Sequence, residues 1–321
     1  MSTPRRDLRI PSVRTRRNLV KKEDFATPLD VVPGFLTWFR ALPDIYGGRD
    51  LKRVVDRIVD AKAGDRAVGA ALGAHVLKVG LSPLIIDLVR RGFISHVATN
   101  GAGAVHDWEV AFMGETSEDV AENLHDGSFG FWRETFDALN GAARRASSQG
   151  EGYGEAVGRS ILDAGLPHAE LSVFAECARL GVPATVHVAF GCDITHMDPE
   201  LDGAALGAAT QRDFWRLTET VEHLSGGVWL NIGSAVIMPE VFLKAVSIAR
   251  NRGCLTDDFA TCNFDMLQQY RAITNVVKRP PREGLAILAQ HEIALPLLHQ
   301  AVLATAVDRG VSIEPRESAN G

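Results

Sequence analysis

The chain has 321 residues, of which 46% are apolar and 23% charged, so it can bury a large core and is not expected to be disordered. Its longest apolar stretch, residues 293–307, is interrupted by Pro296 and is shorter than the roughly 20 residues that span a bilayer, which predicts a buried helix. Four cysteines form no CxxC pair, which argues against a disulfide framework and a structural zinc site.

Charge is unevenly distributed along the chain. The formal net charge is −6, but Met1–Asp24 contributes about +5 and the remainder about −11. The basic segment lacks the apolar region of a secretory signal, so we expect a cytoplasmic protein. The acidic remainder suits a cationic substrate better than nucleic acid, and we expect neither nucleic acid nor a membrane as partner. Residues 1–34 form a basic arm, which is a solvated tail, a strap across a neighbouring subunit or, less in keeping with the charge of the remainder, a nucleic-acid contact.

One pattern occurs four times: an amphipathic stretch, a glycine at its end, a β-rich run, and a loop of small and polar residues. The four units lie at residues 83–103, 169–193, 211–235 and 240–265. Each reads as a helix followed by a strand, because glycine after a helix supplies the left-handed cap conformation. The pattern predicts an α/β fold with a doubly wound, mostly parallel sheet and helices on both faces.

The same pattern sets the domain organisation that we expect. Residues 35–310 form one α/β domain with an insertion at about 112–165, and residues 311–321 should fray. In such a sheet, ligands bind beyond the carboxyl ends of the strands. The loops Thr99–Gly103, Gly191–Asp198, Gly233–Ala235 and Thr261–Asp265 are therefore the predicted rim of the active site.

Several residues on this rim could carry chemistry. The small residues of Thr99–Gly103 follow a strand and open a helix, so they could admit a pyrophosphate or simply form a tight turn; His106 stands where a full dinucleotide motif has its third glycine. His106 and the adjacent Asp107 could act as acid and base or cap a helix. Asp193 and Asp198, with His196 between them, could hold a cationic chain or a cofactor ribose, or form Asx-turns. We expect no metal here.

Lys278 lies between an apolar pair and a proline turn. A lysine that is partly desolvated at such a place has its ammonium form disfavoured and can attack an imine or a carbonyl. An exposed lysine near a turn is the alternative, and composition alone does not separate the two.

The order of these elements resembles that of deoxyhypusine synthase. The segments Leu72–Ser82 and Ile94–Asp107 look like the first two NAD-contacting segments of that family, and Asp193–Asp198 looks like its paired acids. Gly233 and Ser234 fall on its glycine-rich turn, and Lys278 precedes Pro296 by about the spacing that separates the imine-forming lysine from the final helix. The resemblance covers roughly residues 68–302.

The resemblance implies a Rossmann-like fold, NAD as cofactor, and transfer of an aminobutyl group from the polyamine spermidine to an amine acceptor. Lys278 and His106 would be catalytic, and Asp107, His196 and Asp198 would bind substrate. The residues implied to bind NAD are Thr99, Asn100, Gly101, Gly103, Asp193, Gly233, Ser234, Thr261, Cys262 and Asp265. The family also implies a homotetramer with sites at subunit interfaces.

The chain departs from the family pattern at several places. The glycine triplet reads Gly233-Ser234-Ala235, the tryptophan near the lysine is absent, and His106 replaces a glutamate. We therefore leave two acceptors open, putrescine giving homospermidine and the lysine of the hypusine-bearing translation factor. A non-catalytic NAD-binding scaffold and a sirtuin-like NAD-dependent deacylase are the alternative functions.

Overall fold

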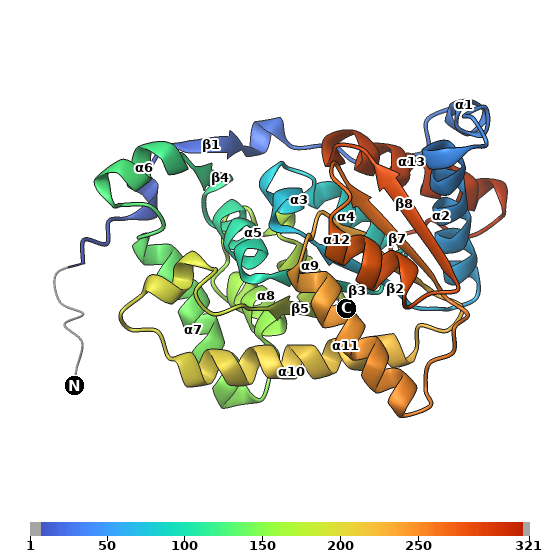
Figure 1. Ribbon diagram of the computed structural model, residues 1–321. Coiled ribbons are helices and arrows are strands. Elements are labelled where there is room, and N and C mark those ends of the chain that lie inside the picture. Colours follow the sequence, from blue (N-terminus) through green and yellow to red (C-terminus); the bar gives the residue numbers. More distant parts are fainter. Residues whose placement is uncertain (1–7, 317–321) are drawn as a thin grey trace.

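The computed structural model describes residues 8–316 and contains a six-stranded, fully parallel sheet (Figure 1). Its order is β5-β3-β2-β6-β7-β8. The strands are β2 (Val68–Leu72), β3 (His96–Asn100), β5 (Ala184–His187), β6 (Val228–Ile232), β7 (Ala260–Asp265) and β8 (Glu283–Leu288). The chain runs outward from β2 to β5, returns to pair β6 with β2, and runs outward to the other side. The predicted α/β fold with a parallel sheet is confirmed.

Helices cover both faces of the sheet. Those of the chain are α1 (Phe35–Arg40), α2 (Tyr46–Ala63), α3 (Ala74–Lys78), α4 (Ser82–Arg90), α5 (Gly101–Met113), α6 (Val120–Asp126), α7 (Arg133–Gln149), α8 (Tyr153–Asp163), α9 (Val173–Leu180), α10 (Gly203–Glu222), α11 (Ile237–Asn251), α12 (Tyr270–Ala272) and α13 (His291–Asp308). Short 3₁₀ turns are η1 (Val13–Thr15), η2 (Lys22–Asp24), η3 (Ala169–Leu171) and η4 (Ile194–Met197); η5 (Ile273–Lys278) is a π-helix. Within residues 8–316, none of these helices is both long enough and apolar enough to cross a membrane.

The core forms two layers because strand side chains alternate between the two faces. Leu72, Leu230 and Ile232 pack with α2, α4 and α13 in the larger layer. Ala71 and Trp229 face the other way and pack with α10 and α11 (Figure 1). The glycines that we expect after the four helices, Gly92, Gly181, Gly226 and Gly253, all have positive φ, which confirms the helix-to-strand steps.

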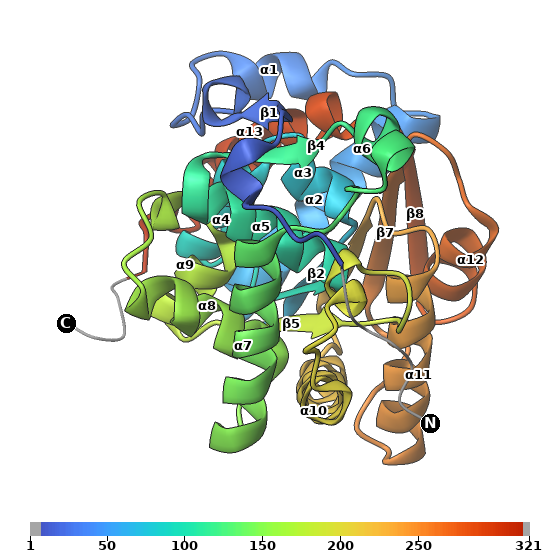
Figure 2. The same cartoon turned by 90° about the vertical axis from the view of Figure 1, so that its left-hand side faces the viewer.

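A second, two-stranded antiparallel sheet joins the N-terminal segment to the expected insertion. It pairs β1 (Asn18–Lys21) with β4 (Glu115–Glu118). Together with α6, this ribbon lies over the end of the large sheet toward which the strand arrows point (Figures 1 and 2). The described part of the basic arm therefore packs on its own chain, whereas residues 1–7 lie outside the described residues.

The C-terminal segment differs from expectation. Residues 311–316 were expected to fray, but the carbonyl of Ile313 accepts a hydrogen bond from Arg91 at 3.0 Å and the amide of Arg316 donates to Arg90 at 2.7 Å. These contacts fix the segment against the end of α4. Residues 317–321 lie outside the described residues.

Candidate functional site

The strand order reverses between β2 and β6, and the loops after these two strands touch. Gly73 follows β2 and Gly233 follows β6; a Cβ atom at Gly73 would overlap the carbonyl oxygen of Gly233. Only a glycine allows two backbones to approach so closely. A reversal of this kind opens a crevice at the carboxyl edge, where parallel α/β sheets bind ligands.

His291, the first residue of α13, lies directly behind this crevice. A Cβ atom at Gly233, which has a φ of +73°, would overlap the ring of His291. The Nε2 atom lies 3.2 Å from the carbonyl oxygen of Phe264 and must donate to it, because a carbonyl only accepts. Nδ1 is therefore an acceptor, and it is buried without a partner among the described residues.

The amino end of α5 is already occupied by a carboxylate. Asp193, from the loop after β5, lies against Gly101 so closely that a Cβ there would overlap its Oδ2 atom. The carboxylate accepts a hydrogen bond from the amide of Ala102. The sequence left a pyrophosphate contact and a tight turn open here, and in the structure the chain's own carboxylate fills the position. Burial raises the pKa of Asp193 to about 6, and Oδ2 has no hydrogen-bond partner among residues 8–316.

A cavity of 250 Å³ lies beside Asp193 at the same edge. It is bounded by α3, α5, the loop after β5, the N-terminal segment and the β4–α6 region. Its polar and charged lining residues are Arg16, Lys78, His106, Glu109, Ser117, Glu118 and Asp193. Apolar side chains, Val105, Val120, Phe129 and Ile194 among them, complete the wall.

A chain of hydrogen bonds fixes the tautomer of His106. The hydroxyl of Thr116 donates to Glu109 Oε2 at 2.7 Å, so its oxygen must accept from His106 Nδ1, also at 2.7 Å. Nε2 is consequently the unprotonated nitrogen of this ring. Burial, followed by the nearby charges of Lys78 and Arg16, lowers the pKa of His106 to about 3. The ring is neutral near neutral pH.

Glu109 also forms a buried ion pair with Arg16. The guanidinium is 2.5 Å from Oε2, and both side chains are 1% exposed. The Arg16 guanidinium also lies 5.2 Å from the centre of the Trp132 ring. The N-terminal segment thus supplies part of the cavity wall.

Glu118, the last residue of β4, is held by one oxygen only. Its Oε2 accepts hydrogen bonds from Asn123 Nδ2 at 2.8 Å, from the amide of Gly130 at 3.2 Å and from Trp132 Nε1 at 3.0 Å. Its Oε1 has no partner among the described residues. The preceding Ser117 has a φ of +67°, an uncommon conformation that brings both residues into the cavity wall.

The structure brings together some of the residues predicted from sequence. His106 and Asp193 line the cavity, and Asn100 caps α5 by accepting from the amide of Gly103 at 3.0 Å. Gly101 lies beneath Asp193, Gly103 packs on Thr99, and Gly233 lies at the crevice.

Two of the predicted hydroxyl residues are buried and bound to the backbone. Thr99 donates its hydroxyl to the carbonyl of Leu72. Ser234 is buried after β6, where its hydroxyl accepts from the amide of Met238.

Other predicted substrate residues are engaged elsewhere. Asp107 is buried on another side of α5, where it accepts from the Ser172 hydroxyl and the Val173 amide at the start of α9. Asp198 ties the loop to α7 by accepting from Asn140 at 2.6 Å. His196 accepts from the amide of Gly191 and stacks on Phe190, so it shapes the loop. None of the three lines the cavity.

Two residues implied to bind the cofactor, Thr261 and Cys262, lie elsewhere than expected. β7 runs to Asp265, so Thr261 and Cys262 lie inside the strand and not in the loop after it. Thr261 donates to the carbonyl of Val276 at the amino end of the sheet, and Cys262 belongs to the core. Asp265 does end the strand, and its Oδ1 accepts from the amide of Leu267.

Lys278 lies apart from the cavity within one chain. It is the last residue of η5, it is exposed, and its segment packs against Thr261 and Gly284, near the amino ends of β7 and β8. Of the two alternatives left open from the sequence, the exposed lysine near a turn is the one that the structure shows. The amine does not reach the carboxyl edge of its own sheet.

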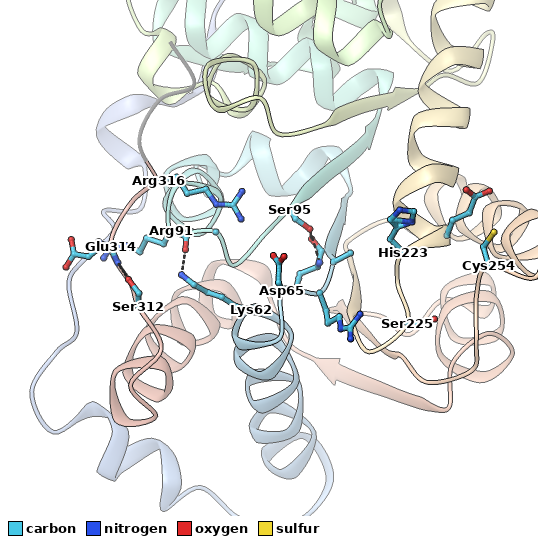
Figure 3. A pocket seen from close by; sticks show the side chains of 15 residues that line it. Lys62, Asp65, Arg91, Ser95, His223, Ser225, Cys254, Ser312, Glu314 and Arg316 are labelled. Carbon is cyan, nitrogen blue, oxygen red and sulfur yellow. Dashed lines mark hydrogen bonds between the residues drawn. The ribbon is translucent and has the colours of Figure 1, made fainter. Parts of the chain in front are cut away.

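A larger cleft, of 780 Å³, opens at the amino edge of the sheet (Figure 3). Figure 3 shows Lys62, Arg91 and Arg316 on one side of it and His223 and Cys254 on the other. Lys62 donates to the carbonyl of Arg91 at the end of α4, which is the usual role of a cation at a helix carboxyl end. Burial lowers the pKa of Lys62 to about 8. Because Lys62 serves a helix end and parallel α/β sheets bind ligands at the carboxyl edge, we place the functional site at that edge.

Sequence reasoning missed Arg16, Lys78, Glu109 and Glu118. Lys78 stands inside the segment Leu72–Ser82 that resembles an NAD-contacting region, so it could have been considered. Glu118 and Arg16 carry no local signal, because their place in the wall depends on the pairing of β1 with β4.

Comparisons with known proteins place the fold. No protein-family model matches the chain. A protein named ornithine cyclodeaminase from Methanothermobacter thermautotrophicus is 26% identical over 133 residues, which are 41% of this chain and 29% of that protein. The chain therefore spans less than a third of the length of this relative.

Solved structures with a similar fold are more distant in sequence. AgrE in a ternary complex with ornithine and NAD⁺ has a TM-score of 0.53 at 14% identity, over 81% of this chain and 34% of that one. A candidate deoxyhypusine synthase from Entamoeba histolytica has a TM-score of 0.50 at 13% identity, over 80% and 88%. These values show a shared fold alone. The resemblance to deoxyhypusine synthase is confirmed at the level of the fold and no further.

Proposed function

We propose that this chain is an enzyme that binds NAD at the carboxyl edge of its sheet and oxidises the amine-bearing carbon of a small organic cation. The observation that carries the proposal is the position of Asp193. It is a buried carboxylate with an unpartnered oxygen next to the 250 Å³ cavity, and only β3 separates its strand, β5, from β2. NAD, when bound, supplies the hydride acceptor. The relative named ornithine cyclodeaminase and the AgrE complex with ornithine and NAD⁺ support the same cofactor and substrate class.

We place the dinucleotide at the switch point between β2 and β6. Gly73 and Gly233 leave both loop backbones free of side chains where the strand order reverses, and backbone amides of such loops hold pyrophosphates. His291 Nδ1, a buried acceptor without a partner among the described residues, offers a hydrogen bond to a donor placed there. Asp193 fills the amino end of α5, so the pyrophosphate belongs at Gly73 and not at Gly101.

The chain's own residues prepare the amine for oxidation. Asp193 binds the substrate ammonium and accepts a proton from it, and its pKa near 6 suits a base that works close to neutral pH. Neutral His106 accepts a hydrogen bond on Nε2. With NAD⁺ bound, the cofactor would supply the hydride acceptor, and the substrate carbon and nitrogen would form a protonated imine, with Asp193 holding the one proton that the substrate loses.

The experiment is a single turnover at equal concentrations of protein and NAD⁺. Small amines and amino acids are added, and the absorbance of bound NADH is followed after rapid mixing. We expect NADH to form with a subset of the amines. In Asp193→Asn, NADH should form at least about a hundredfold more slowly, because the base that accepts the substrate proton is lost. NAD⁺ binding without any NADH would leave a non-catalytic scaffold or a deacylase, and would contradict the proposal.

Aminobutyl transfer from spermidine is the finer version of this function. Its first step is the same kind of oxidation of an amine-bearing carbon. Transfer through Lys278 needs a homo-oligomer, such as the homotetramer implied by the family, that carries this side chain from a second copy to the cavity. Borohydride trapping with spermidine and NAD⁺ tests it: a mass addition that is lost in Lys278→Ala supports transfer to putrescine or a protein lysine, and an addition that persists contradicts it.

A further inference from the structure

The cavity contains three charged groups that no other charge in residues 8–316 neutralises. Arg16 and Glu109 pair with each other and contribute no net charge. Lys78 has no carboxylate within ion-pair distance, and Glu118 and Asp193 have no Lys or Arg within that distance. The nearest titratable neighbour of Asp193 is His196, at 3.7 Å, and burial lowers the pKa of that histidine. One positive and two negative groups therefore face the cavity unpaired.

Both carboxylates are built into the wall and do not sample solvent freely. Glu118 is 8% exposed and Asp193 is 6% exposed. The three donors that hold Glu118 are an amide side chain, a backbone amide and an indole, so they orient the carboxylate without cancelling its charge. Oδ2 of Asp193 is buried without a hydrogen-bond partner among the described residues, and the three hydrogen bonds to Glu118 all go to its Oε2 atom. Buried carboxylates of this kind are stabilised by a cationic partner.

Lys78 supplies the opposite charge at the end of α3. It lines the same cavity as His106, and its ammonium is one of the charges that lower the pKa of that ring. A ligand with ammonium groups alone would meet repulsion from Lys78. A carboxylate on the ligand would instead pair with it.

We propose that the cavity recognises a basic amino acid with two ammonium groups and one carboxylate. Lys78 binds the carboxylate, Asp193 binds the ammonium on the reacting carbon, and Glu118 selects the second ammonium. The inference rests on the function proposed above and assigns Asp193 to the substrate, although the family resemblance implied a cofactor contact. A volume of 250 Å³, below the roughly 300–1,000 Å³ of drug-sized sites, has room for a free amino acid.

The test compares three ligands by calorimetric titration of the full chain saturated with NADH, which accepts no hydride and so prevents turnover during the titration. L-Ornithine carries all three charges, putrescine lacks the carboxylate, and L-norvaline lacks the second ammonium. We expect L-ornithine to bind at least about tenfold more tightly than either, because each missing ion leaves a buried charge unpaired. Equal affinity for L-ornithine and putrescine would overturn the proposal, as would failure of L-ornithine to bind.

Two variants assign the charges. Glu118→Gln should remove the preference for L-ornithine over L-norvaline, and Lys78→Met should remove the preference over putrescine. Glu122→Gln makes the same change as the first variant on the exposed surface of α6 and should keep both preferences. Unchanged preferences in Glu118→Gln and Lys78→Met overturn the assignment.

Titration of NAD⁺ alone separates the two proposals and reports on folding of each variant. If NAD⁺ does not bind the wild type, the proposed function fails. If NAD⁺ binds and NADH forms with other amines while L-ornithine has no advantage, the function stands and the assignment of the cavity fails.

Discussion

His106 Nδ1 lies 2.7 Å from the hydroxyl oxygen of Thr116, and the proton of that hydroxyl is donated to Glu109. Thr116, on β4, thereby fixes the tautomer of His106, on α5, and leaves Nε2 unprotonated. Thr116→Val removes the acceptor of the Nδ1 proton and should slow NADH formation at least about tenfold while NAD⁺ affinity stays near that of the wild type. Thr116→Ser keeps the hydroxyl and should restore the rate. A Thr116→Val variant as fast as the wild type would refute this role.

The ion pair between Arg16 and Glu109 should make the N-terminal segment contribute to the stability of the folded chain. Arg16→Met leaves Glu109 buried without its cation and should lower the free energy of unfolding by about 3–5 kcal/mol. Adding Glu109→Gln removes the unpaired charge and should recover part of the loss. Urea unfolding measures both variants, and equal stability of Arg16→Met and the wild type would contradict the pairing.

Asp107 and Glu118 should respond differently to substitution, because only one of them lines the cavity. Asp107→Ala removes hydrogen bonds to Ser172 and Val173 and should cost about 2–4 kcal/mol of unfolding free energy, with unchanged ligand preference in the folded fraction. Thermal unfolding and calorimetry with L-ornithine check the two parts. A variant of normal stability that loses ligand binding would place Asp107 in the site after all.

Asp213 should make stability depend on pH. Its carboxylate accepts from the amides of Gly154 and Val186, and burial raises its pKa to about 7, above the 3.8 of a free side chain. The folded chain therefore binds this proton more strongly than the unfolded chain, and stability is lost as pH rises from about 4 through about 7. Asp213→Asn removes that titration. The free energy of unfolding of the variant, relative to that of the wild type, should therefore rise by a few kcal/mol between about pH 4 and about pH 7.

Urea unfolding of both proteins at a series of pH values measures this difference. The comparison isolates Asp213 from His96, His106 and His187, whose lowered pKa values contribute equally in both chains and with the opposite sign. A stability difference that does not change with pH would count against a buried, titrating Asp213.

Local patterns sufficed for the framework of the fold. Glycines such as Gly92 and Gly181 end helices through backbone geometry that the sequence displays directly, so the helix-to-strand steps and the carboxyl-edge loops could be predicted. Thr261 was placed wrongly because the polar Asn263 was taken as the start of a loop, whereas β7 runs three residues past Cys262.

The site was harder to predict because its wall is assembled from distant segments. Asp193 and His106 were identified by residue type near a strand end. Glu118 becomes a candidate ligand-binding residue only when the fold brings Trp132 and Gly130 to its carboxylate. Lys278 is excluded from the cavity of its own chain only by its place at the end of η5. These outcomes depend on tertiary contacts that no local pattern displays.

The most direct test of the account is a titration of NAD⁺ into Gly73→Ala beside Gly47→Ala. The first adds a methyl group where the two loop backbones touch, and the second adds one where nothing lies within 4 Å. We expect saturable NAD⁺ binding to the wild type and to Gly47→Ala, and at least about a tenfold loss of affinity in Gly73→Ala. Unaltered affinity in Gly73→Ala, or a wild type that does not bind NAD⁺, would contradict the account.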